Sequence, residues 1–159
     1  MDSRRILING LSAWGGGSSS TYATTGTIDG VDELQAGTYA TMDWRYHELV
    51  PEFEIALSVL ARVISRRDGA VVLDVGVKGA GGEFGVPRVV GFPDAQAPFF
   101  LSEEHLVIRD APRQWRVGEA VELHSSHACT TCNLYREMVI RAGDDVVERW
   151  PIEAAGRLA

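Results

Sequence analysis

The chain has 159 residues, of which 45% are hydrophobic and 23% are charged, a composition typical of folded globular proteins and not of disordered ones. This length allows one domain with its own core, or one domain and part of another. The formal net charge of −7 argues against binding to nucleic acid or to an anionic membrane surface. The sequence contains no run of about 18 apolar residues and no clear secretory signal, so we expect a cytoplasmic protein without a membrane span.

The predicted elements of the first half begin with an apolar run at residues 5–12, which is typical of a buried strand. A Gly/Ser-rich loop follows at residues 13–22, and it is either a linker or a phosphate-binding loop with exposed amides and hydroxyls. Residues 38–42 alternate as in a strand, and residues 69–77 combine β-branched side chains with glycine boundaries. Residues 53–66 fit a helix nearly as well as a buried strand.

The second half contains only short strand candidates, separated by Gly, Pro or Asp turns: residues 87–92, 99–108, 119–125, 134–142 and 145–152. The sequence AGDDVV indicates a hairpin turn between the last two. Short strands at intervals of about 8–12 residues are typical of a β-barrel or a β-sandwich, and not of alternating strands and helices. We therefore predict a mainly β fold.

The segment HSSHACTTCN, residues 124–133, contains two of the four histidines and both cysteines. Thiols or metal ligands are expected here instead of a disulfide, because two cysteines do not make a disulfide framework. If the segment is a strand, alternation places His127 and Cys129 on one face and His124 and Cys132 on the other. This arrangement favours a two-ligand zinc site with open positions, as in catalytic zinc centres. Two alternatives remain: His127 and Cys129 as core residues, or as a base and its nucleophile.

The C-terminal forty residues, from GEAVELHSSHACTTCNLY to the end of WPIEAAGR, resemble the closing segment of the D-serine dehydratase and D-threonine aldolase family. These are pyridoxal-phosphate (PLP) enzymes of the alanine-racemase-like fold, fold type III. The shared pattern is a strand followed by H-x-C, T-x-N-L-Y and, after a hairpin, W-P-I. The sequence departs from this pattern at Ser126 and in the final AAGR. The matching residues are His127, Cys129, Thr131, Asn133, Leu134, Tyr135, Trp150, Pro151 and Ile152.

The resemblance extends upstream to about residue 6. ELQAGTYATMD is similar to the strand that leaves the family's barrel, and FLSEEHLVI matches an S-E-E-H segment. VISRRDGAVVLDVGVKG resembles a strand pair that ends in D-x-G-x-K, with Asp74, Gly76 and Lys78 in place. The resemblance also implies that residues 53–66 form a strand.

LSAWGGGSSSTY is similar to the family loop that receives the cofactor phosphate, which implies Gly16, Gly17 and Ser18 as phosphate contacts, although the family's proline is missing. On this basis residues 1–30 are the end of a (β/α)₈ barrel that carries this loop. Residues 31–159 are then a D-serine dehydratase-like β domain, resembling the C-terminal domain of fold type III enzymes.

The resemblance implies a lyase that acts on small D-3-hydroxy amino acids. In the family, the residues matching His127 and Cys129 hold zinc beside the cofactor, where the metal binds the substrate's β-hydroxyl and PLP withdraws electrons from Cα. Dehydratases of the family typically have cysteine at the second position, so Cys129 favours β-elimination. A retro-aldol lyase of the D-threonine aldolase type is the alternative.

The family's Schiff-base lysine belongs to an N-terminal (β/α)₈ barrel that this sequence does not contain. Lys78 is the only lysine, and it matches the second domain instead, so no catalytic residue is assigned and PLP is expected only together with a barrel. Three interpretations stay open: a subunit that pairs with a separate barrel chain, a piece of a longer lyase, or an inactive metal-binding or interaction module. We expect a homodimer or a complex with a barrel chain.

Overall fold

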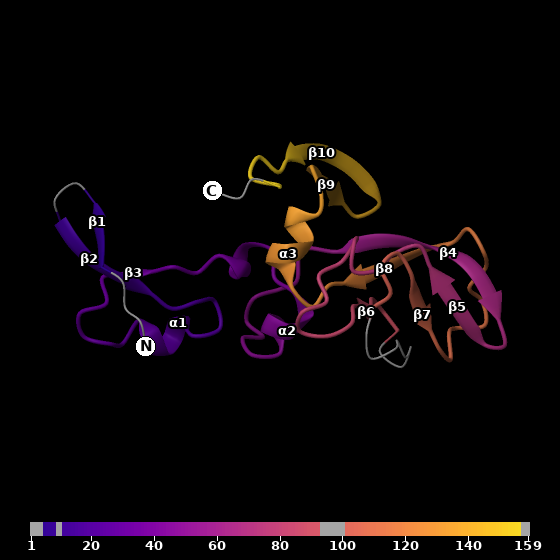
Figure 1. Cartoon of the computed structure of the whole chain (residues 1–159), viewed down its shortest axis with the longest axis horizontal. Helices are drawn as coiled ribbons and strands as arrows, with labels where there is room; N and C mark the ends of the chain where they lie inside the picture. Colours follow the sequence, from indigo (N-terminus) through magenta and orange to yellow (C-terminus); the bar gives the residue numbers. More distant parts are fainter. Residues whose placement is uncertain (1–4, 9–10, 93–100, 157–159) are drawn as a thin grey trace. The chain divides into compact units, whose positions relative to one another are not determined.

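The structure, a computed structural model, describes residues 5–8, 11–92 and 101–156 (Figure 1). The chain divides into two compact units, residues 1–56 and 57–159, which are described one after the other. The predicted division between residues 30 and 31 refers to the barrel of the family and stays a prediction.

The first unit is built around a small sheet in which β1 and β2 form an antiparallel hairpin and β3 adds to β2 in parallel. Short helical turns follow β2 and β3 in the chain. The elements are β1 (Arg5–Ile8), β2 (Leu11–Gly16), α1 (Tyr22–Thr25), β3 (Glu33–Leu34), the 3₁₀ turn η1 (Thr38–Ala40) and α2 (Trp44–His47).

The strand predicted at residues 38–42 is wrong, because this stretch forms η1. The Met42 backbone N–H donates to the Thr38 carbonyl over 2.7 Å and closes the turn. The buried Asp43 then caps α2, since its Oδ1 accepts the Tyr46 N–H at 2.8 Å. Hydrogen bonds within the stretch thus replace those that a neighbouring strand would supply.

The second unit contains a curled antiparallel five-stranded sheet in the order β6-β8-β4-β5-β7 (Figure 1). A short helix, α3, and a two-stranded ribbon, β9–β10, follow in the chain. The elements are β4 (Val59–Arg67), β5 (Ala70–Leu73), β6 (Arg88–Val89), β7 (Leu106–Ile108), β8 (Ala120–His124), α3 (Ala128–Asn133), β9 (Glu137–Ala142) and β10 (Asp145–Pro151). The predicted mainly β fold is confirmed, and so is the strand in the ambiguous stretch at 53–66, which starts at Val59.

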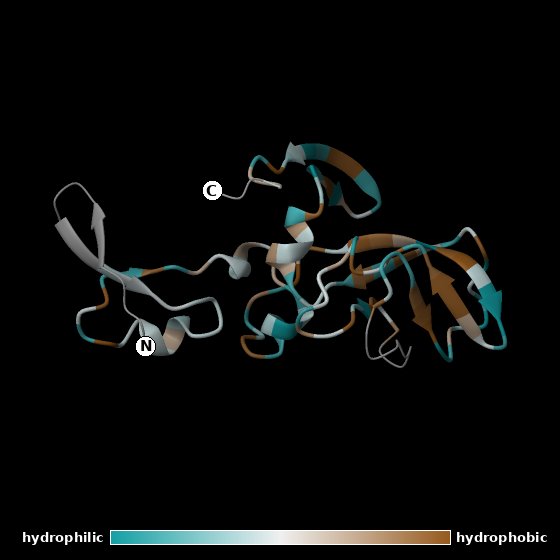
Figure 2. Cartoon of the chain, viewed as in Figure 1, coloured by the Kyte–Doolittle hydropathy of each residue, from teal (hydrophilic) through white to brown (hydrophobic). Residues whose placement is uncertain are grey.

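The core of this unit lies on one face of the sheet. Along β4, Val59, Ala61 and Val63 are buried while the residues between them are exposed, which is the alternation of a strand with one covered face. Figure 2 shows the hydrophobic residues gathered along the central strands. Trp115 closes the core, only 6% exposed and packed edge-on against Phe92 at 5.2 Å between ring centroids. Each fully buried Val, Leu or Ile side chain of this core contributes about 1.5–3 kcal/mol to stability.

The ribbon β9–β10 confirms the predicted hairpin turn, with Gly143 at a φ of 64° between the two strands. All seven residues of β10 are exposed. The Arg141 guanidinium of β9 donates to the Glu122 carboxylate of β8 over 2.7 Å, which ties the ribbon to the sheet. Among the described residues, no helix has the length and apolar character needed to cross a membrane.

Candidate metal centre

The segment 124–133 ends a strand and continues as a turn and a helix, so the assumption of a strand, from which His127 and Cys129 were paired, is wrong. β8 ends at His124, and two buried serines lead to His127, which is extended (φ −145°, ψ 109°) and is the N-cap residue of α3. Cys129 is the second helical residue and Cys132 lies one turn further. The segment lacks the β-branched run and the aromatic residues that favour strands, and its serine and threonine hydroxyls bond locally instead.

The backbone at His127 is fixed by a group of buried hydrogen bonds. The Thr131 hydroxyl donates to the His127 carbonyl at 2.7 Å and accepts the Gly81 N–H at 2.9 Å. The Ser126 hydroxyl donates to the Gly81 carbonyl at 3.0 Å. A Cβ on Gly81 would come within 2.8 Å of the His127 carbonyl oxygen, so only glycine allows this approach. The loop at Gly81 and the start of α3 therefore form one rigid frame.

The imidazole of His127 is held by contacts on its edge and on its face. Its Nδ1 lies 3.2 Å from the Thr130 hydroxyl and 3.5 Å from a Glu83 carboxylate oxygen. Phe84 packs against the ring with 4.7 Å between centroids. The side chain remains 23% exposed, so the ring is oriented and still accessible.

Both cysteines are thiols, but their surroundings differ. Cys129 is exposed, whereas Cys132 is partly covered. Burial raises the pKa of the Cys132 thiol, and the nearby charge of Cys129 adds to this effect. Because the thiolate is the metal ligand and the nucleophile, Cys129 is the better ligand.

His127 and Cys129 are thus brought to the same first turn of α3, while His124 stays on β8. Within the described ranges, no group of three or more His, Cys, Asp and Glu side chains could hold a metal ion. A metal bound here would have two protein ligands, with water or substrate at its other positions. An imidazole and a thiolate suit zinc, and such an open sphere suits a catalytic ion, so the donor set fits the predicted metal.

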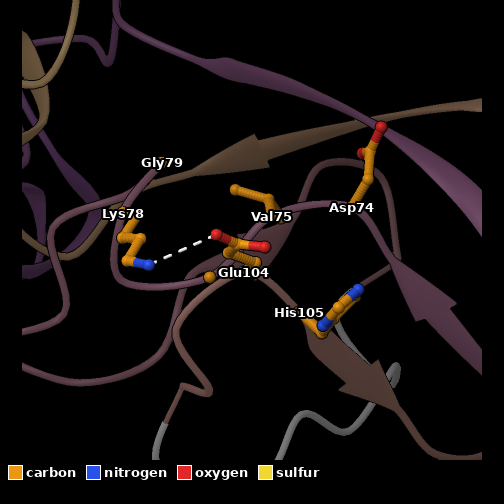
Figure 3. A pocket seen from close by; sticks show the side chains of 7 residues that line it. Asp74, Val75, Lys78, Gly79, Glu104 and His105 are labelled. Atoms are coloured by element: carbon orange, nitrogen blue, oxygen red, sulfur yellow. Dashed lines mark hydrogen bonds and ion pairs between the residues drawn. The ribbon is translucent and has the colours of Figure 1, made fainter.

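The D-x-G-x-K and S-E-E-H segments meet at a second place, a hollow lined in part by Asp74, Lys78 and His105 (Figure 3). Lys78 Nζ lies 2.8 Å from a Glu103 carboxylate oxygen and 3.2 Å from one of Glu104. These carboxylates, Glu103 first, raise the pKa of Lys78. A lysine that forms a Schiff base needs a lowered pKa, so the environment of Lys78 is that of an ion-paired surface cation.

The glycine of D-x-G-x-K, Gly76, is needed for a close backbone contact and not for contact with a ligand. A Cβ at this position would come within 2.3 Å of the Ser102 carbonyl oxygen. On either side of this close approach, the Val77 N–H donates to Ser102 and the Lys78 N–H donates to Glu103. Nearby, the Tyr135 hydroxyl donates to the Gly79 carbonyl at 2.7 Å. The D-x-G-x-K, S-E-E-H and T-x-N-L-Y segments, which all match the family pattern, therefore lie in contact.

The predicted phosphate loop lies in the first unit. Gly16 is the last residue of β2, and Gly17 adopts a φ of +80° with no space for a Cβ beside Thr25. The Ser18 amide donates to the Thr21 hydroxyl at 3.0 Å, and the Ser18 hydroxyl lies 2.9 Å from that of Ser20. The loop thus presents a cluster of hydroxyls of the kind that binds phosphate oxygens, while the Ser18 amide is already used.

Comparison with known proteins identifies the family. Residues 56–141, more than half of the chain, match the family model described as "Putative serine dehydratase domain". The chain belongs to this family. It is 33% identical over 158 residues to D-threonine aldolase of an Arthrobacter species, covering 95% of this chain and 41% of that protein. It is 31% identical over 154 residues to 3-hydroxy-D-aspartate aldolase of Paracoccus denitrificans, covering 90% of this chain and 39% of that protein.

The chain spans about two fifths of the length of these two relatives. Among solved structures it resembles D-threonine aldolase from Filomicrobium marinum, with a TM-score of 0.80, 31% identity, and coverage of 89% of this chain and 41% of that one. An alanine racemase-like protein from Idiomarina loihiensis shares the fold, with a TM-score of 0.65 at 22% identity over 86% of this chain and 42% of that one. The predicted fold, that of the C-terminal part of alanine-racemase-like enzymes, is confirmed.

Sequence reasoning missed the residues of the family domain that surround His127. Glu83 and Phe84 lie more than forty positions earlier in the chain. Their one sequence signal is GGEFG, a carboxylate and an aromatic residue between glycines. That pattern is common in turns and does not point to a histidine elsewhere.

Proposed function

We propose that this chain is the zinc-binding, C-terminal part of a PLP-dependent lyase for D-3-hydroxy amino acids. The observation that carries the proposal is the placement of His127 and Cys129 on an accessible helical turn with a rigid backbone frame, in a chain of the serine dehydratase domain family. The names of the relatives, D-threonine aldolase and 3-hydroxy-D-aspartate aldolase, support the substrate class.

The spacing of the two ligands gives further support. D-threo-3-hydroxyaspartate dehydratase has been solved as a histidine-to-alanine variant and, in a metal-free form, as a cysteine-to-alanine variant, at positions two residues apart. His127 and Cys129 have the same separation. At 22% identity the overall likeness to that enzyme is one of fold.

In the proposed site, bound zinc supplies a Lewis acid for the substrate's β-hydroxyl, and bound PLP supplies an electron sink for Cα. His127 and Cys129 hold the metal, and Phe84 packs against the imidazole and helps to orient it. Gly16, Gly17 and Ser18 belong to the loop that offers hydroxyls to the cofactor phosphate.

Two reactions are compatible with such a site, and they differ in the bond that breaks. β-Elimination breaks the Cα–H and Cβ–O bonds and leads to a 2-oxo acid and ammonia, and the thiol ligand Cys129 favours it. Retro-aldol cleavage breaks the Cα–Cβ bond and leads to an aldehyde and glycine. The relatives above 30% identity that carry an enzyme name are aldolases, which favours this second reaction.

The chain's only lysine, Lys78, is ion-paired, so we propose that turnover needs a (β/α)₈ barrel with its own lysine, in the same or a separate polypeptide. A homodimer or a hetero-complex with that barrel is the expected assembly. We also propose a cytoplasmic location, since a reducing compartment keeps the thiol of a metal-binding cysteine available as a ligand.

The metal is tested by elemental analysis of the purified chain and of three variants. Wild type and His124→Ala are expected to carry one zinc ion, because His124 lies outside the turn. His127→Ala and Cys129→Ala are expected to lose it. Absence of metal from the wild type, or its full retention by His127→Ala, would contradict the proposal.

The reaction is tested on D-serine and D-threonine with added PLP, with and without a barrel chain. We expect no turnover by this chain alone, and either 2-oxo acid and ammonia or aldehyde and glycine with the barrel. Turnover by the chain alone, together with a borohydride-reducible PLP adduct on Lys78, would show that Lys78 is catalytic. Zinc binding without turnover in any assembly would favour the inactive module.

A further inference from the structure

The edge of the His127 ring faces two oxygen atoms from different elements. Nδ1 lies 3.2 Å from the hydroxyl of Thr130 on α3 and 3.5 Å from a carboxylate oxygen of Glu83, which is in the loop between β5 and β6. The Glu83 carboxylate and the Thr130 hydroxyl therefore lie on the same edge of the ring. The imidazole, the hydroxyl and the carboxylate therefore form one connected group.

The protons of this group can be assigned from its donors and acceptors. An ionised carboxylate only accepts hydrogen bonds, whereas the Thr130 hydroxyl can either donate or accept. A proton on Nδ1 suits both neighbours, because the Glu83 oxygen then faces a donor and the Thr130 oxygen can accept. A proton on Nε2 instead would turn the Nδ1 lone pair toward the Glu83 carboxylate, so Nδ1 carries the proton. A neutral imidazole has one N–H, so the lone pair lies on Nε2.

The loop around Glu83 is shaped for this contact. A Cβ on Gly81 would come within 3.0 Å of the Glu83 carboxylate, so the glycine leaves room for it. The same glycine is hydrogen-bonded to Thr131 of α3 and to Ser126, which lies just before α3. Phe84, the next residue in the loop, packs against the imidazole. One short loop thus supplies the carboxylate of Glu83, the ring of Phe84 that packs on the imidazole, and the backbone of Gly81 that is hydrogen-bonded beside His127.

We propose that Glu83, with Thr130, is a positioning residue that fixes His127 as the Nδ1–H tautomer and thereby makes Nε2 the metal-binding nitrogen. The proposal rests on the zinc site proposed above. It explains which nitrogen of His127 is available to bind the metal. Outer hydrogen bonds of this kind orient metal-binding histidines and raise their basicity.

The first test reads the tautomer without metal. The ¹⁵N-labelled full chain is studied by long-range ¹H–¹⁵N correlation at a pH where the imidazole is neutral, and the His127 signals are assigned by their loss in His127→Ala. We expect the Nδ1–H pattern in the wild type and in Glu103→Gln, a control that removes an exposed carboxylate of the same unit. Glu83→Gln introduces an amide that can donate to Nδ1, so the Nε2–H form should appear.

The second test measures zinc affinity by competition with a chromophoric chelator. Glu83→Gln is expected to bind zinc about 10–100-fold more weakly, with Glu103→Gln unchanged, and Thr130→Ala should shift the affinity in the same direction. Tryptophan fluorescence, to which the buried Trp115 contributes, checks that each variant is folded. An Nε2–H tautomer in the wild type, or an unchanged tautomer and affinity in Glu83→Gln, would overturn the positioning role.

The two proposals can fail separately. If the wild type binds no zinc but its tautomer depends on Glu83, the metal site is wrong and the positioning role stands. If the wild type binds zinc and Glu83→Gln changes neither readout, the metal site stands and the positioning role is wrong.

Discussion

The two thiols of α3 are only one helical turn apart, yet they should react differently. Burial and the Cys129 charge raise the pKa of Cys132, so at neutral pH a smaller fraction of Cys132 is thiolate, and that thiolate is less accessible. We expect iodoacetamide to modify Cys129 first, as measured by mass spectrometry of peptides after short exposures. Added zinc should slow the reaction of Cys129. Equal rates for the two thiols, with and without zinc, would contradict this expectation.

The neighbouring serines before His127 give a matched pair of substitutions. Both are buried, but Ser126 donates to the Gly81 carbonyl, whereas the Ser125 hydroxyl has no hydrogen-bond partner in the described part of the chain. Ser126→Ala should lower the free energy of unfolding by about 1–2 kcal/mol, because it leaves a buried carbonyl without its donor. Ser125→Ala should leave stability unchanged or raise it. Urea denaturation monitored by tryptophan fluorescence compares them, and a larger loss in Ser125→Ala would refute the assignment.

For these residues, the candidate ligands could be predicted from the sequence, but their surroundings could not. His127 and Cys129 follow from the H-x-C pattern, although alternation along a strand was the wrong physical reason for pairing them, since both lie at the start of a helix. Glu83 could not be predicted, because its contact with His127 joins residues 44 positions apart. Such contacts depend on the folded loop and leave no local pattern.

Among the elements, the connection after β5 depends on a close backbone approach at Gly76. Gly76→Ala should lower the free energy of unfolding by about 3 kcal/mol, the upper end for overpacking, because the new Cβ would meet the Ser102 and Glu103 backbone, which cannot move aside as a side chain can. Gly37→Ala is the control, since nothing lies within 4 Å of a Cβ there and its φ is −125°. Thermal or urea unfolding measures both. Similar stabilities of the two variants would show that the 102–103 backbone can shift.

The strands were easier to predict than the helices, for a physical reason. Alternation with period two is visible within four or five residues, as at β8, where buried positions alternate with more exposed ones. At β4 the burial alternates as well, but there the family resemblance was needed to choose between helix and strand. The helical turns η1, α2 and α3 have three to six residues, too few to show a 3.6-residue period. Their formation depends on hydrogen bonds from side chains such as Asp43 and Thr131, which a pattern of hydropathy does not record.

For the whole molecule, the second unit should fold without the first. It has its own core and contains His127, Cys129, Glu83 and Thr130. A fragment of residues 57–159 is expected to unfold cooperatively, to keep the emission of a buried Trp115, and to bind zinc as the full chain does. Circular dichroism, fluorescence and chelator competition check these three properties. A fragment that lacks cooperative unfolding would show that the first unit is needed for stability.

The fold class of the whole chain followed from strand spacing alone, because short strands between Gly, Pro and Asp turns leave few other architectures. The five-stranded order did not follow, since β4 pairs with β8 and β5 pairs with β7, and both pairings join segments far apart in the sequence. The sequence also does not show which surface would contact a barrel, so the expected assembly depends on the proposed function.

The ion pair of Lys78 with Glu103 and Glu104 has a practical consequence for labelling. The chain has a single ε-amine, and the side chain of Lys78 is 57% exposed. Because Glu103 and Glu104 raise its pKa, this amine should resist acylating reagents near neutral pH and accept them under more alkaline conditions. Once the α-amine has been blocked near neutral pH, where it reacts first, an amine-reactive dye added at alkaline pH would label Lys78, close to the meeting point of the D-x-G-x-K and S-E-E-H segments, and could report the approach of a barrel chain by fluorescence.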